Sequence, residues 1–111
     1  MESGRQLLML PHRPTAIFAS NDDMAAGVVM AAHEMGIDVP GQLSITGFDD
    51  TVVARTIWPR LTTVHQPSYD LAYAATGLLL QMLKTRKPPA PVRLAHQLVC
   101  RESAGPAPAG A

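Results

Sequence analysis

Short apolar runs and longer helical patterns alternate along the first half of the chain. Residues 15–19 and 43–48 are apolar runs of strand length, as buried parallel strands tend to be. Between them, residues 22–35 repeat apolar side chains at helical spacing, and Gly36 follows where a helix commonly ends. A strand, a helix and a second strand in this order predict an α/β fold with a parallel sheet.

The second half of the chain predicts shorter and more mixed elements. Residues 51–58 read as an irregular or single-turn helical segment, and residues 61–64 as a short β-branched run. A helix is expected over residues 68–85, with Ser68 as its N-cap. Residues 92–100 alternate between apolar and polar side chains, which is typical of a half-solvated edge strand.

These elements together predict a core of three strands, residues 15–19, 43–48 and 92–100. The last strand is expected at the edge of the sheet, where it can run parallel or antiparallel. The helices over residues 22–35 and 68–85 accompany the sheet, and the second of them is expected to stand away from it.

Both ends of the chain differ from the middle in pattern. Residues 5–10 read as the last turns of a helix that has no capping signal at its start and is ended by Pro11. We therefore interpret residues 1–13 as the remnant of a truncated helix. Residues 105–111 are low in complexity and are expected to form a disordered tail.

Composition and charge narrow the possible functions. The 111 residues carry nine basic and nine acidic side chains, and this balance argues against a DNA-binding surface on the chain. No run approaches the ~20 apolar residues of a membrane span, and no signal-peptide core follows the first residues, so a cytoplasmic location is expected. The single cysteine, Cys100, excludes an internal disulfide and is expected to be a buried thiol. The four histidines lack metal-ligand spacing, so we expect neither a metal nor a cofactor.

Polar side chains follow the first two predicted strands directly. Asn21 comes after the first strand and Asp49 after the second. Because ligands of parallel α/β sheets bind outside the carboxyl ends of the strands, these two corners point to one site. Asn21 or the neighbouring Asp22 is expected to cap the following helix, with Asp23 in its first turn, and Asp50 is expected to bond to the backbone of the next turn.

Acidic pairs after successive strands also occur in phosphotransfer receivers, where they bind Mg²⁺. A receiver needs a lysine at the end of a late strand, but the candidate strands here end in Gln66 and Arg101. The chain also has no Gly-x-Ser-x-Gly elbow and no glycine-rich phosphate loop. An enzyme is therefore not expected, and a receiver-like module remains the less favoured alternative.

Four segments resemble the lactose/galactose-repressor family of bacterial transcription regulators. They are PTAIFASNDDMAAG at residues 14–27, ITGFDD at 45–50, PRLTTVHQP at 59–67 and LVCRES at 98–103. Each segment is weak evidence alone, but the four occur in the order and at the spacing of the family. A fragment of a periplasmic sugar-binding protein of the same fold is the alternative.

The resemblance implies a partial periplasmic-binding-protein-like lobe, Rossmann-like, with a parallel sheet and flanking helices. Residues 14–104 would be the C-terminal part of an effector-binding and dimerisation domain, and the chain would lack the family's helix-turn-helix. No DNA contact is expected from this chain alone, and a homodimer or larger species is expected.

The family's functional positions carry over onto particular residues. Asn21 and Asp49 would face the effector, a sugar or nucleoside-like molecule, because an amide and a carboxylate suit adjacent hydroxyls. Gln66, in the family's crossover segment, would approach the same cleft. The positions that correspond to the family's dimer contacts are all apolar: Ala25, Ala26, Val29, Met30 and Ile57.

Overall fold

The computed structural model describes residues 2–108. It divides into two compact units, which are treated separately below. The first contains the chain up to His65 and from Leu98 onwards, and the second is Gln66–Gln97.

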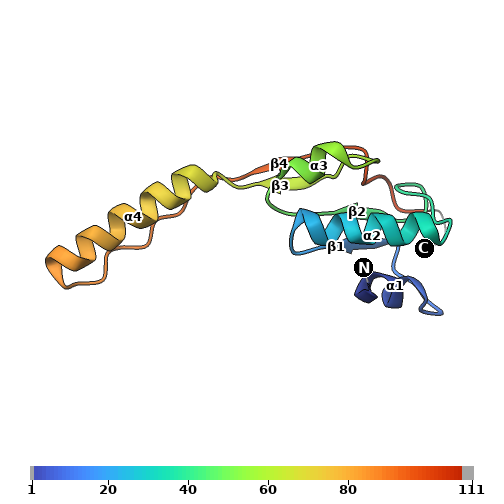
Figure 1. Cartoon of the computed structure of the whole chain (residues 1–111), viewed down its shortest axis with the longest axis horizontal. Helices are drawn as coiled ribbons and strands as arrows, with labels where there is room; N and C mark the ends of the chain where they lie inside the picture. The colour runs from blue at the N-terminus through green and yellow to red at the C-terminus, as the bar shows by residue number, and fades with distance from the viewer. Residues whose placement is uncertain (1, 109–111) are drawn as a thin grey trace. The chain divides into compact units, whose positions relative to one another are not determined.

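The first unit is built on a parallel strand pair with a helix between the strands (Figure 1). Strand β1 (Ala16–Phe18) pairs in parallel with β2 (Ser44–Thr46), with Ile17 opposite Ile45, and helix α2 (Asp22–Glu34) connects them. The predicted α/β fold with a parallel sheet is confirmed, and both strands are shorter than their apolar runs.

Helix α2 supplies much of the core beneath this sheet. Its Val29 is fully buried, as are Leu43 and Ile45 around β2 and Leu61 further along the chain. Helix α1 (Glu2–Leu8) packs against α2, and a side chain on Gly4 would meet Val28. Helix α2 ends as predicted, because Gly36 has a φ of +68°, a conformation in which glycine carries no steric penalty.

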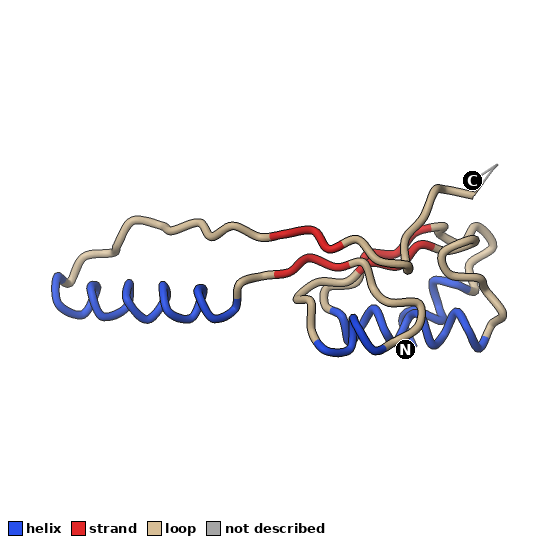
Figure 2. Tube along the Cα trace, turned by 90° about the horizontal axis from the view of Figure 1, so that it is seen from above, coloured by secondary structure: helices blue, strands red, loops and turns tan. Residues whose placement is uncertain are grey.

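The strand predicted over residues 92–100 is wrong in extent and in partner. Only β4 (Gln97–Val99) is a strand, and it pairs with β3 (Thr63–His65) rather than with β2 (Figure 2). Residues 62–65 instead lie beside the end of β2, through parallel bridges from Thr46 to Thr62 and from Asp49 to His65. The alternation of apolar and polar residues could not show which segment of the chain would lie beside β2.

A buried serine beyond β4 completes the hydrogen bonding of β2. The Ser103 hydroxyl donates to the carbonyl of Ile45 and accepts from the Thr62 N–H at 2.9 Å. The Ser103 carbonyl accepts from the Ile45 N–H at 2.8 Å. The segment after β4 therefore occupies the place predicted for β4 itself. Cys100, between them, is exposed rather than buried.

Between β2 and β3, the chain makes the predicted single helical turn, α3 (Val52–Thr56). After Ser103, Gly105 donates its N–H to the Ser44 hydroxyl at 3.1 Å. The predicted tail over residues 105–111 is thus anchored at its start, and its last three residues lie outside the described part of the chain.

The second unit is dominated by helix α4 (Ser68–Thr85), which has no buried residue. The helix lies where the pattern predicts, and Arg86 ends it in the left-handed conformation with a φ of 54°. Ser68 is its first residue rather than its N-cap, because Pro67 occupies the cap position without a side-chain bond. Its apolar side chains Leu71 and Leu79 are both more than half exposed.

Candidate functional site

The two polar corners predicted from the sequence meet at one edge of the first unit. The Ala19 N–H donates to the Thr46 carbonyl at 2.8 Å, and the Asp22 N–H donates to the Phe48 carbonyl at 3.0 Å. These bonds hold the end of β1 against the end of β2. Asn21 and Asp49 consequently lie on neighbouring corners, whereas Gln66 is the first residue of the second unit.

Asn21 caps helix α2. Its Oδ1 accepts the Met24 N–H at 2.8 Å, and its backbone is extended, as an N-cap requires. The carbonyl oxygen of the Asn21 amide therefore serves as the cap of the helix. The amide nitrogen of the same side chain is a hydrogen-bond donor.

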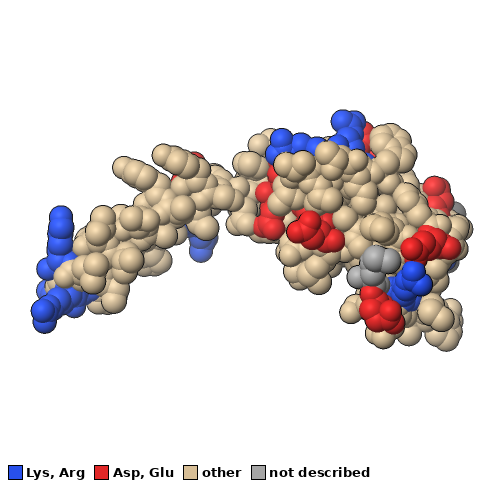
Figure 3. Space-filling model, in the orientation of Figure 1, with Lys and Arg blue, Asp and Glu red and all other residues tan. Residues whose placement is uncertain are grey.

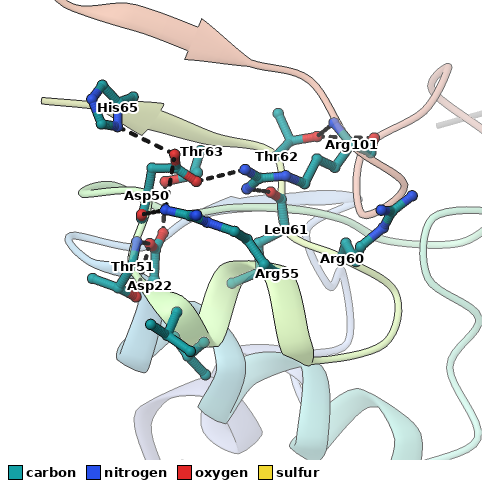
Figure 4. A network of polar contacts seen from close by, with 12 residues as sticks. Asp22, Asp50, Thr51, Arg55, Arg60, Leu61, Thr62, Thr63, His65 and Arg101 are labelled. Atoms are coloured by element: carbon teal, nitrogen blue, oxygen red, sulfur yellow. Dashed lines mark hydrogen bonds and ion pairs between the residues drawn. The ribbon is translucent and has the colours of Figure 1, made fainter.

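Asp22 is fully buried and links three segments of the chain (Figure 4). Its Oδ2 accepts the Thr51 N–H at 2.7 Å and the Thr51 hydroxyl at 3.2 Å. Its Oδ1 accepts the Thr63 hydroxyl at 2.6 Å. The prediction that Asp22 caps its helix is wrong: the carboxylate satisfies donors from the corner after β2 and from β3. Gly47 makes room for it, since a Cβ there would lie 2.4 Å from Oδ1.

Asp49 and Asp50 both have positive φ, at 109° and 57°. Such backbone is uncommon for residues with a side chain, although aspartate tolerates it better than most. Asp49 is half-buried, and its N–H donates to the Val64 carbonyl at 2.9 Å. The corner thus turns sharply, and Asp49 sits at the turn.

The carboxylate of Asp50 is held by three basic side chains rather than by the following turn, which corrects the prediction. Its Oδ1 accepts from Arg101 Nη2 at 2.6 Å, His65 Nδ1 lies 3.2 Å from its Oδ2, and Arg55 is 3.7 Å away. Burial acts to raise the pKa of Asp50, but the Arg101 hydrogen bond and charge, with smaller contributions from Arg55 and His65, hold it below its ordinary value. Asp50 therefore stays ionised as a structural anchor.

Two parts of this site were missed by reasoning from the sequence. Arg101 is separated from Asp50 by half the chain, and only the folded structure brings them together. Phe18 ends β1 with 67% of its surface exposed. An aromatic residue three positions before Asn21 was a signal in the sequence that could have marked it.

The predicted dimer positions differ in accessibility. Ala25 and Val29 have no exposed surface and belong to the core, and Ala26 is also buried. Met30 is 49% exposed, and Ile57 is partly buried against the core.

Between residues 2 and 108, the structure brings together no group of three or more His, Cys, Asp or Glu side chains suited to a metal ion. None of the helices in that range is long and apolar enough to span a bilayer. The carboxylates of Asp22 and Asp50 are used by threonines and basic side chains, which leaves the receiver-like alternative without support.

Comparison with known proteins places this geometry in a family. Residues 1–104 match the periplasmic binding protein-like domain. Over 105 residues, the chain is 40% identical to the HTH-type transcriptional repressor PurR of Escherichia coli, covering 94% of this chain and 31% of the repressor.

Solved structures agree with this match. A LacI transcriptional regulator from a Rhodococcus species has a TM-score of 0.84 at 34% identity, over 96% of this chain and 40% of that one. A LacI family transcriptional regulator from Lactobacillus casei, solved with bound glucose, has a TM-score of 0.75 at 35% identity, over 93% and 37%. This chain therefore spans about a third of the length of the repressor and about two fifths of the solved regulators.

Proposed function

The chain belongs to the periplasmic binding protein-like family, in the LacI group of transcription regulators, and from this we propose that it is the C-terminal effector-binding and dimerisation portion of such a regulator. The effector is a small sugar or a nucleoside-like molecule. A regulator of transcription in bacteria works in the cytoplasm, and that is the location we propose.

The observation that carries this proposal is the meeting of Asn21 and Asp49 at the carboxyl ends of two adjacent parallel strands. A carboxylate accepts hydrogen bonds from two neighbouring hydroxyls, and the Asn21 amide nitrogen donates to a ring or hydroxyl oxygen. The exposed ring of Phe18, at the end of the same sheet, adds an apolar face against which a sugar or base can stack. Gln66 is the third polar contact that we propose.

Bound glucose in the Lactobacillus casei relative supports a polyhydroxylated ligand. We use it as the first probe, beside a panel of sugars and nucleosides. The full-length regulator is the protein to test, because small-molecule sites bury most of their ligand and this chain supplies only one wall. For the 111-residue chain alone, we expect no affinity tighter than millimolar.

Asp49→Ala in the full-length regulator should weaken effector binding by about ten-fold or more, since a hydrogen bond to a charged group contributes about 1.5–3 kcal/mol. Operator binding should survive. Asp23→Ala is the matched control, because Asp23 is an exposed carboxylate in the first turn of α2. Calorimetry showing equal affinity in the wild type and Asp49→Ala would remove Asp49 from the site.

For dimerisation, we infer that exposed apolar side chains near α2 and α3 form the contact. Met30 is 49% exposed, Val52 73% and Trp58 70%, and Ile57 lies beside Trp58. Met30→Glu should shift the regulator towards monomer in sedimentation velocity, because a charge in an apolar interface must be desolvated. Met9→Glu, at a 74% exposed position on another segment, is the control. A wild-type protein that is monomeric at all concentrations would contradict this inference.

The same proposal assigns DNA binding to a part of the regulator outside this chain. The 111 residues have no net charge. A mobility-shift assay with the parent operator at low salt should therefore show no sequence-specific complex with the 111-residue chain, and a sharp specific shift would refute the assignment.

A further inference from the structure

The backbone of the corner at Asp49 is in a conformation that is unfavourable for residues with a side chain. Asp49 and Asp50 have φ values of 109° and 57° in succession, and neither residue is glycine. Residues in such conformations persist only where the surrounding structure overdetermines them. The contacts on either side of the corner therefore decide where the Asp49 carboxylate points.

On one side, Arg101 holds Asp50. Its Nη2 donates to Asp50 Oδ1 at 2.6 Å, and its Nη1 donates to the Leu61 carbonyl at 2.9 Å. Its own backbone is fixed through the Thr62 hydroxyl, which accepts the Arg101 N–H at 2.8 Å. The side chain is only 15% exposed, so water competes little for these bonds.

On the other side, Asp22 holds Thr51. The 2.7 Å bond from the Thr51 N–H to Asp22 Oδ2 fixes the first residue after the strained pair. Because the second oxygen of Asp22 accepts the Thr63 hydroxyl at 2.6 Å, the carboxylate cannot turn without breaking that bond as well. Asp49 itself is tied by its N–H to the Val64 carbonyl.

From these contacts, we propose that Arg101 and Asp22 are positioning residues for ligand recognition: they hold the positive-φ corner from its two sides and thereby aim the Asp49 carboxylate at the effector. The proposal rests on the proposed function in so far as Asp49 binds the effector. Neither residue contacts the ligand in this scheme, and both act through the backbone of residues 49–51.

The first test needs no ligand. Nuclear magnetic resonance of the 111-residue chain reports φ through the three-bond HN–Hα couplings and Cα shifts of residues 49 and 50. In Arg101→Gln, these values should move away from the positive-φ range, while the shifts of the α2 core stay in place. Asp50→Asn should keep the native pattern, because its amide oxygen still accepts from Arg101 and asparagine tolerates positive φ.

Arg60→Gln is the matched control for this test. Arg60 pairs with Glu102, next to Arg101 in sequence, but about half of its side chain is exposed, and it bonds no residue of the corner. Its loss should leave residues 49 and 50 unchanged. Retention of positive φ at both residues in Arg101→Gln and in Asp22→Asn would overturn the proposal. Global unfolding of Asp22→Asn leaves Arg101→Gln to decide.

The second test separates positioning from general stability. In the full-length regulator, Arg101→Gln should weaken glucose, or whichever panel ligand binds, by about ten-fold, the usual loss for a hydrogen bond to a charged group. Combined with Asp49→Ala, it should cost nothing further, because its effect passes through Asp49. Additive losses would show that Arg101 acts elsewhere. If no panel ligand binds the wild type, the proposed function fails, and the couplings at residues 49 and 50 still judge the positioning role.

Discussion

Helices α2 and α4 have similar apolar patterns and opposite environments. Seven residues of α2 are buried, among them Val28 and Val29, whereas α4 is five residues longer and has none. Basic side chains gather at the C-terminal end of α4 (Figure 3), where Lys84 lies in the last turn, Arg86 is the C-cap and the helix dipole favours positive charge. An apolar stripe thus predicts a helix, but its contribution to stability depends on a surface that covers it.

The largest expected difference between the two units comes from removing one leucine in each. Leu43→Ala should lower the free energy of unfolding of the first unit by about 2–5 kcal/mol, because Leu43 is 1% exposed and its loss leaves a cavity. Leu79→Ala on α4, at 57% exposure, should change stability by less than about 0.5 kcal/mol. Urea denaturation with hydrogen exchange read separately in α2 and α4 measures both. Equal losses would mean that α4 is covered in solution.

A pair of glycines sharpens the same comparison. Gly47→Ala should destabilise the first unit by about 1–3 kcal/mol, because the new Cβ would lie 2.4 Å from Asp22 Oδ1 and 3.2 Å from Asp22 Cα. Gly77→Ala should stabilise α4 by roughly 1 kcal/mol, since no atom lies within 4 Å of the added Cβ and alanine is the better helix former. Circular dichroism during thermal unfolding should show shifts of opposite sign. Two shifts of the same sign would contradict the assigned environments.

Acid should loosen the corner of the first unit before it affects α4. The native pKa of Asp50 lies below its ordinary value of 3.8, so its ionised form stabilises the fold above that value. This contribution is lost as the pH falls from about 3.8 through the lowered native pKa. Asp50→Asn should flatten this part of the stability profile. Hydrogen exchange at residues 49–51 across this range is the measurement, and an identical profile in wild type and Asp50→Asn would exclude Asp50 as the cause.

The smallest effect is expected at the exposed pair of Arg60 and Glu102. Arg60→Gln should leave the free energy of unfolding almost unchanged, because exposed ion pairs contribute little in water. In the same urea experiment, the loss of stability in Arg60→Gln should be close to that of Leu79→Ala and far smaller than that of Leu43→Ala. A loss as large as that of the buried leucine would mean that this pair is shielded from solvent.

Local pattern in the sequence determined the elements near the site. The run around Ile17 and Ile45 predicted the parallel strands, the spacing after Asn21 predicted α2, and the polar residues at both strand ends predicted one shared corner. These features depend on neighbours within a few residues and on the side-chain periods of strand and helix, which are 2 and about 3.6 residues. They can therefore be predicted from the sequence without knowledge of the fold.

Tertiary structure alone decided which segment lies beside β2, which acidic residue is buried and which arginine reaches Asp50. Asp22 and Asp23 are adjacent and identical in type, yet one is fully buried on Thr51 and Thr63 while the other is exposed. Arg101 reaches Asp50 because the segment that contains it lies along β2, where Ser103 bonds to the Ile45 carbonyl. Such contacts join residues about 30 to 60 positions apart, and no local repeat records them.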